Sequence, residues 1–208
     1  VAIDHGSAKA LAETYGFPIR SRGGLTGEEM VETAARDGLE VLYSSGGNFL
    51  DVLPDPQQVR DALGRVPVRV HQDIIVSSQM LVEPNDIVVL LPACTRYEQR
   101  GGGTETTTER RIAFSPEIEG PRIGEARPEW EIFLDLARRV APERAHLVAF
   151  EDADAIREEI ARVVPAYAGI EGLQKLGDSV QWGGTRLCEG GAFPTPDGRG
   201  HFRAVQPP

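Results

Sequence analysis

Asp86-Ile87-Val88-Val89-Leu90-Leu91-Pro92-Ala93-Cys94, followed by Gly101-Gly102-Gly103-Thr104-Glu105-Thr106-Thr107-Thr108-Glu109-Arg110-Arg111, decides the fold of this chain. The apolar run before Pro92 is rich in Ile and Val, which predicts a strand buried on both faces, as in a parallel sheet. Proline has no backbone N–H to donate, so we expect strand pairing to end at Pro92. The glycine-rich stretch predicts a long loop, and long loops inside compact domains are usually functional or disordered. Because open α/β sheets bind ligands at the carboxyl ends of their strands, this junction indicates a ligand site.

Two more strands and their helices precede this junction. Strands are predicted over 39–43 and 66–71, a helix over 56–63 and a short helix over 78–82. Strands that alternate with helices through short connections form right-handed βαβ units and a parallel sheet. The sequence therefore predicts the α/β class with an open parallel, Rossmann-like sheet.

Other helices are predicted on both sides of these units. Thr26 and Glu29 fit the N-cap and N3 positions of a capping box, which starts a helix that Gly38 ends. The clearest helix covers 129–140, and a further helix begins at Asp152 or Asp154. Helical spacing predicts an inward face on each of these last two helices. The residues of these faces are Trp130, Phe133, Ala137 and Val140 in the first, and Ile156, Ile160 and Val163 in the second.

The chain divides by composition near residue 165. Residues 1–165 are predicted to form the α/β domain, with 1–38 as a helical lead-in. Residues 166–208 are glycine-rich and are predicted to be a linker and the start of a following domain. The chain begins with Val1 and ends in Gln206-Pro207-Pro208, which we interpret as the ends of a fragment.

Composition and charge exclude several classes of function. The net charge is -10, with 22 basic and 32 acidic residues, and this sign opposes non-specific binding to nucleic acid or to anionic membranes. The two cysteines and four histidines are scattered, so the sequence predicts neither a disulfide framework nor a metal site. It contains no signal peptide and no apolar stretch of membrane-spanning length, so we expect a cytoplasmic protein.

Three stretches at the carboxyl ends of the predicted strands are candidates for ligand binding. The turn 45–48 offers backbone amides to phosphate, and Asp73 offers a carboxylate to ribose hydroxyls or a guanine edge. Gln99 and Arg100 begin the glycine-rich stretch, where an arginine suits a diphosphate. Each has a structural alternative, since glycines serve tight turns and Asp73 is equally placed to cap the short helix after it. Cys94 is more typical of a small buried hydrophobe than of a nucleophile.

Several motifs, taken together in their order and spacing, resemble the molybdopterin oxidoreductases. The similarity is closest to the formate-dehydrogenase-like alpha subunits of the dimethyl sulfoxide reductase superfamily, and it covers roughly residues 40–203. Thr107 stands where relatives often carry Asn, and Glu129 where many carry Asp. The motifs are Val70-His71-Gln72-Asp73-Ile74, Leu91-Pro92-Ala93-Cys94-Thr95, Tyr97-Glu98, Gly103, Thr108-Glu109-Arg110-Arg111 and Glu125-Ala126-Arg127-Pro128-Glu129-Trp130-Glu131-Ile132.

The resemblance implies a bis(molybdopterin guanine dinucleotide) cofactor that carries molybdenum and lies between two Rossmann-like domains. This chain corresponds to much of one of them, and residues 193–202 look like the entry to the family's final cofactor-binding domain. It also implies an iron–sulfur cluster in a preceding part, an electron-transfer subunit and a small substrate such as formate. By position, the implied cofactor-binding residues are Gly47, Asn48, Gln72, Asp73, Gln99, Arg100 and Glu129.

The family's catalytic groups have no match in this sequence. We identify no four-cysteine cluster site and no molybdenum-ligating cysteine, selenocysteine or serine, so we expect this piece alone to be inactive. The sequence accordingly predicts no catalytic residue and no metal ligand. Two alternatives stay open: a non-catalytic nucleotide-binding or scaffolding α/β domain, and a family member that has lost its metal ligand.

Overall fold

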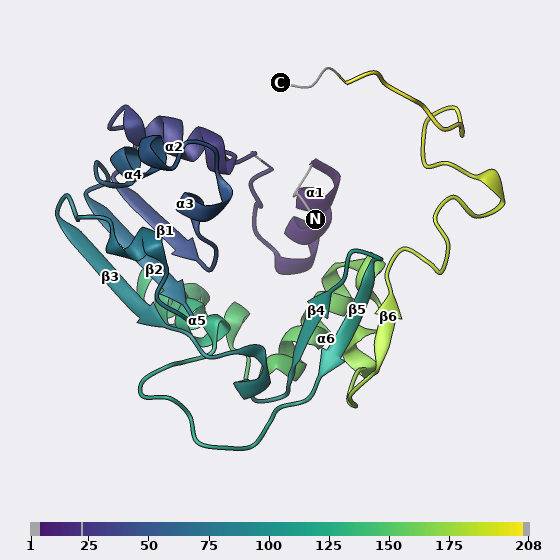
Figure 1. The fold of residues 1–208 in the computed structure, drawn as a ribbon. Helices are drawn as coiled ribbons and strands as arrows, with labels where there is room; N and C mark the ends of the chain where they lie inside the picture. The colour runs from purple at the N-terminus through teal and green to yellow at the C-terminus, as the bar shows by residue number, and fades with distance from the viewer. Residues whose placement is uncertain (1–4, 22, 206–208) are drawn as a thin grey trace.

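A computed structural model describes residues 5–21 and 23–205, which form two small sheets with helices around them (Figure 1). The first sheet is parallel, with the strand order β1 (Val41–Ser45), β2 (Val68–Asp73), β3 (Ile87–Pro92). The second is antiparallel, with the order β4 (Gly103–Thr106), β5 (Arg111–Ser115), β6 (Ser179–Gln181). The predicted α/β class with an open parallel sheet is confirmed.

Helices α2 (Gly27–Ala35), α3 (Phe49–Val52) and α4 (Pro56–Leu63) cover one face of the parallel sheet (Figure 1). Apolar side chains from both layers form the main core, because α2 and α4 turn their buried stripes toward the sheet. The predicted capping box of α2 is present: Thr26 Oγ1 accepts from Glu29 N, and Glu29 Oε2 accepts from Thr26 N. The core residues are Val31, Ala34, Leu42, Leu50, Val59, Ala62, Leu63, Val66 and Val82.

The prediction that the third strand is buried on both faces is wrong. β3 is an edge strand, and Ile87 and Leu90 are 48% and 50% exposed. The pairing of β3 with β2 does end at Pro92, opposite Asp73, as predicted, and the next amide, Ala93 N, donates to Asp73 O at 2.9 Å. An apolar run of this kind indicates a high propensity for a strand, but it does not indicate whether helices or another sheet cover that strand.

The prediction of a long loop over 101–111 is also wrong, because most of this stretch is a β-hairpin. β4 pairs with β5, and the turn closes where Thr107 N donates to Arg111 O at 2.8 Å. Gly102 permits the hairpin to approach its neighbours, since a Cβ there would lie 2.6 Å from the Phe114 ring. A second core of Ile112, Phe114, Ile170 and Leu173 lies beneath this sheet.

Helix α5 (Glu129–Val140) has the predicted bounds, but its buried face differs from the prediction. Leu134 is its buried residue, whereas Phe133 is 42% exposed and Val140 is 76% exposed. Of the predicted inward residues, Trp130 and Ala137 are partly buried, so the prediction is right for these two and wrong for Phe133 and Val140. Helix α6 (Ala153–Val163) begins as predicted after Asp152, whose Oδ1 accepts from Asp154 N and Ala155 N.

The remaining elements are short connections and one further helix. Helix α1 (His5–Tyr15) contacts α6, and the segment after β6 leads away from both sheets (Figure 1). No helix within the described ranges is long and apolar enough to span a bilayer. The 3-10 helices are η1 (Ser78–Leu81), η2 (Arg96–Glu98), η3 (Pro142–Val148), η4 (Pro165–Tyr167), η5 (Ile170–Gly172) and η6 (Glu189–Gly191).

Candidate functional site

The turn after β1 presents open backbone at the carboxyl edge of the parallel sheet. Gly46 and Gly47 both have positive φ angles, of 67° and 74°, and an added Cβ at either position would meet no atom within 4 Å. Gly46 N donates to Gln72 O at 2.8 Å, which ties the turn to the end of β2. The turn is therefore anchored on one side and open on the other, as close approach of a ligand to backbone requires.

Asn48 holds this turn in place through its side chain. Its Oδ1 accepts from Leu50 N at 3.1 Å as the N-cap of α3, and its Nδ2 donates to Asp51 Oδ2 and to Ser78 Oγ at 2.7 and 2.8 Å. The amide group is thus already engaged at both ends, so in this conformation Asn48 positions Gly46 and Gly47.

A run of hydrogen bonds joins β2, β1 and α5. Gln72 is fully buried, its Oε1 accepts from Tyr43 Oη at 2.5 Å, and its Nε2 donates to Ser45 Oγ at 3.2 Å. Ser45 Oγ in turn donates to Glu129 Oε1 at 3.2 Å. Burial, and secondarily the negative charge of Glu129, raises the pKa of the Tyr43 phenol, so the phenol keeps its proton and its hydrogen bond to Gln72 to a higher pH than an exposed tyrosine would.

Asp73 ends β2 and faces a different hollow. Its Oδ1 accepts from Ile74 N at 2.7 Å, and it lines a cavity of about 290 Å³ with mostly apolar side chains. The alternative interpretation of Asp73 as a helix cap does not hold, because Ser77 is the N-cap of η1. His71 lines the same cavity, and burial together with the positive charge of Arg69 lowers the pKa of its imidazole.

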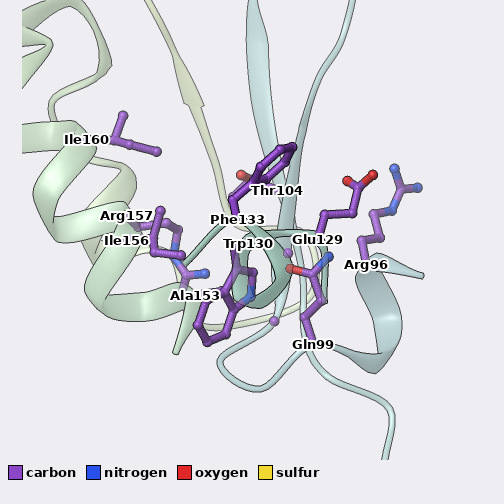
Figure 2. A pocket seen from close by; sticks show the side chains of 12 residues that line it. Arg96, Gln99, Thr104, Glu129, Trp130, Phe133, Ala153, Ile156, Arg157 and Ile160 are labelled. Atoms are coloured by element: carbon purple, nitrogen blue, oxygen red, sulfur yellow. The ribbon is translucent and has the colours of Figure 1, made fainter. Parts of the chain in front are cut away.

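A cavity of about 340 Å³ lies between α5, α6 and the start of β4 (Figure 2). Gln99 and Glu129 line it on one side, and Trp130 and Arg157 face it from the two helices. Tyr43 of β1 contacts Phe133 of the cavity wall, with 5.6 Å between their ring centroids. Glu129 lines the cavity and also accepts a hydrogen bond from Ser45, so the cavity wall contacts the carboxyl edge of the parallel sheet at two places.

Arg100 lies apart from these groups. It lines a third cavity, of about 220 Å³, and its Nη2 donates to the backbone oxygen of Glu151. The structure thus brings Gln72 and Glu129 together through Ser45, and places Gln99 beside Glu129. It leaves Asp73 and Arg100 in separate cavities.

Sequence reasoning missed two contributors to the site, Tyr43 and Arg157. Ser45 was predicted to contribute a backbone amide of the 45–48 turn, but not its side chain, and Tyr43 was expected only as part of a strand. Arg157 was not singled out, although Ala153, Arg157 and Ile160 follow the four- and three-residue spacing of one helix face, which places a charge on an apolar stripe. That spacing was the available signal.

Comparison with known proteins shows which proteins this chain is similar to. No protein-family model matches it. It is 30% identical over 204 residues to the F420-dependent formate dehydrogenase 1 subunit alpha of Methanococcus maripaludis, a match that covers 93% of this chain and 28% of that protein. It is 32% identical over 170 residues to a nitrate reductase of Synechocystis, covering 79% of this chain and 22% of that protein.

A second alpha subunit from the same archaeon gives the same result. The F420-dependent formate dehydrogenase 2 subunit alpha is 31% identical over 192 residues, which cover 88% of this chain and 27% of that protein. The chain therefore spans less than a third of the length of these relatives. The resemblance found in the sequence is confirmed: over most of its length, this chain is a homologue of one segment of the formate dehydrogenase alpha subunits and nitrate reductase of the molybdopterin oxidoreductase family.

Proposed function

We propose that this chain is the part of a molybdenum-dependent oxidoreductase that binds one molybdopterin guanine dinucleotide arm. The observation that carries the proposal is the carboxyl edge of the parallel sheet, where the open Gly46-Gly47 turn lies beside Gln72 and Asp73. Edges of this kind are where open α/β sheets bind nucleotides. The homology to formate dehydrogenase alpha subunits supports the same assignment.

The donors and acceptors at this edge suit the parts of such a cofactor. Open amides of the turn accommodate phosphate oxygens, and the second carboxylate oxygen of Asp73 accepts no hydrogen bond from the described residues, so it is available to a guanine or ribose donor. A cavity of about 340 Å³ accepts only part of a dinucleotide, so the rest of the arm would lie along the open edge. Of the residues that the resemblance implies, Gly47 and Asp73 are proposed to contact the arm, and Gln99 and Glu129 to line the adjoining cavity. Asn48 and Gln72 are proposed to support the edge from within the protein, and Arg100 would contact only a part of the cofactor that extends to its own cavity.

The role of the chain would be binding and orientation. When bound, the cofactor supplies two-electron redox chemistry on a small substrate such as formate. The chain's own residues would fix the nucleotide end, and the Tyr43-Gln72-Ser45-Glu129 run would keep the edge in one arrangement. The remaining domains of a longer protein and an electron-transfer subunit are its proposed partners.

The test replaces Asp73 in the full-length protein. We expect Asp73→Ala to lower the molybdenum and guanine nucleotide content of the purified protein, because a hydrogen bond to a charged group contributes about 1.5–3 kcal/mol, roughly 10–100-fold in affinity. Molybdenum is measured by mass spectrometry of the metal and guanine nucleotide by chromatography after acid release.

The matched control is Asp86→Ala. Asp86 is an exposed carboxylate immediately before β3, at the opposite end of the sheet, so its replacement should leave both contents unchanged. Equal cofactor content in the Asp73 variant, the Asp86 variant and the wild type would contradict the proposed site. A different result would favour the non-catalytic nucleotide-binding alternative: the wild type contains no molybdenum but binds GDP, and Asp73→Ala no longer binds GDP.

A further inference from the structure

Arg157 of α6 is a buried cation whose hydrogen-bonding capacity is only partly used. The residue is 4% exposed, and its Nη2 donates to Asp154 Oδ1 at 2.7 Å. Its guanidinium carbon lies 4.8 Å from the centroid of the Phe114 ring. Nε and Nη1 have no hydrogen-bond partner among the described residues. Buried donors without partners are unfavourable, so an acceptor that reaches them is bound more tightly than at an exposed arginine.

The side chain of Arg157 lines the 340 Å³ cavity, and a second unused donor lines the same wall. Trp130 Nε1 also lacks a hydrogen-bond partner in the described part of the chain. Figure 2 shows both side chains at the wall of the cavity, Arg157 from α6 and Trp130 from α5. Two helices thus each contribute to this cavity a side chain with an N–H donor that has no partner in the described part of the chain.

The other charged groups of the cavity differ from Arg157 in exposure or in charge. Arg96 forms an ion pair with Glu105 and also has an unpartnered Nε, but its side chain is about one third exposed, and Glu129 is an acid that accepts the hydrogen bond from Ser45. Asp154 occupies the Nη2 side of the Arg157 guanidinium and leaves its remaining nitrogens unused. Arg157 is therefore the more deeply buried of the two arginines that line the cavity, and it has two unpartnered nitrogens where Arg96 has one.

We propose that this cavity binds a phosphate group through the free donors of Arg157 and the indole N–H of Trp130. Charge-assisted hydrogen bonds from arginine are well suited to phosphate oxygens. Phe133, Ile156 and Ile160 also line the cavity, beside the polar Gln99, Thr104 and Glu129, so part of the volume beyond the phosphate suits an apolar or planar group attached to it. The phosphate belongs either to the free ion or to a nucleotide. The site stands independently of the proposed molybdenum cofactor, since inorganic phosphate alone tests it.

The experiment titrates the 208-residue protein with inorganic phosphate, and separately with GDP, by isothermal calorimetry at low ionic strength. We expect saturable binding, and at least a tenfold weaker affinity in Arg157→Met and in Arg157→Lys, which keeps the charge but loses the planar donors. Arg162→Lys is the control, because Arg162 lies on the same helix, pairs with Glu159 and is exposed. Its affinity should equal that of the wild type.

Trp130→Phe provides a second variant that leaves every charge in place. It removes one N–H donor, so we expect a several-fold loss of phosphate affinity even if circular dichroism shows Arg157→Met to be unfolded. Equal affinities for phosphate and GDP would support a site for the phosphate group alone, and tighter GDP binding would support a nucleotide phosphate. Absence of saturable binding by the wild type, or unchanged affinity in Arg157→Lys and Trp130→Phe, would overturn the proposal.

Discussion

At the scale of single residues, the structure shows the burial and the charged neighbours of Cys94, which its position in the sequence only suggests. The residue follows β3, is 5% exposed, and was predicted to be a small buried hydrophobe, which the structure confirms. Burial, and secondarily the negative charge of Glu98, raises the pKa of its thiol. Asp73 illustrates the opposite case. Its place at the end of β2 was readable from the sequence, but the apolar cavity around it was not, because distant residues such as Leu90 form that cavity.

The two thiols should therefore react at different rates. We expect iodoacetamide at pH 8 to modify Cys188, which is only partly buried, well before Cys94, because the thiolate is the reactive form and burial disfavours it. Peptide mass spectrometry after timed quenching measures both sites. In urea the two rates should become similar. Faster labelling of Cys94 in the native protein would show that the strand end opens readily.

At the scale of elements, the sequence predicted what local patterns determine. The bounds of α4 and α5 and the cap of α2 were correct, since proline, threonine and acidic positions specify helix ends directly. β4 and its pairing with β5 were missed because threonines and glycines suit a loop as well as an edge strand such as β4. Its pairing partner β6 also comes from more than 60 residues further along the chain, beyond the reach of a local pattern.

Gly102 is the position on which this hairpin depends. We expect Gly102→Ala to lower the free energy of unfolding by about 1–3 kcal/mol, because its φ angle is +72° and the added methyl would meet Phe114 and the Ser115 carbonyl. Urea denaturation followed by circular dichroism measures the change. Gly172→Ala is the control, since an added Cβ there meets no atom within 4 Å. An equal effect of both substitutions would mean that the hairpin tolerates the methyl group.

At the scale of the whole molecule, a few side-chain contacts join segments that are distant in sequence. Tyr15 Oη of α1 donates to Glu159 Oε1 of α6 at 2.5 Å, across 144 residues. Burial, followed by the hydrogen bond to Glu159, raises the pKa of Tyr15 to about 12. No local pattern predicts such a pair. For the same reason, the separation of Asp73 and Arg100 into different cavities was not predictable from strand order alone.

The hydrogen bond between Tyr15 and Glu159 should make the stability of the folded protein fall at alkaline pH. The folded state holds the Tyr15 proton more tightly than the unfolded chain, so the stabilisation is complete below pH 10 and is lost as the pH rises toward 12. At pH 7, a double-mutant cycle of Tyr15→Phe and Glu159→Gln should give a coupling of about 0.5–1 kcal/mol, modest because Tyr15 is partly exposed. Urea unfolding at pH 7, 10 and 11.5 measures both effects. Additive substitutions, or an unchanged alkaline profile in Tyr15→Phe, would contradict this expectation.

The hydrogen bond between Ser45 and Glu129 has a consequence for the order in which parts of the chain fold. It connects residues 84 positions apart, and it requires both the finished edge of β1 and the first turn of α5. Contacts of such long range form slowly, because a large segment must be ordered before they contribute. We therefore expect the edge that is proposed to bind a nucleotide to be completed after the helices have formed.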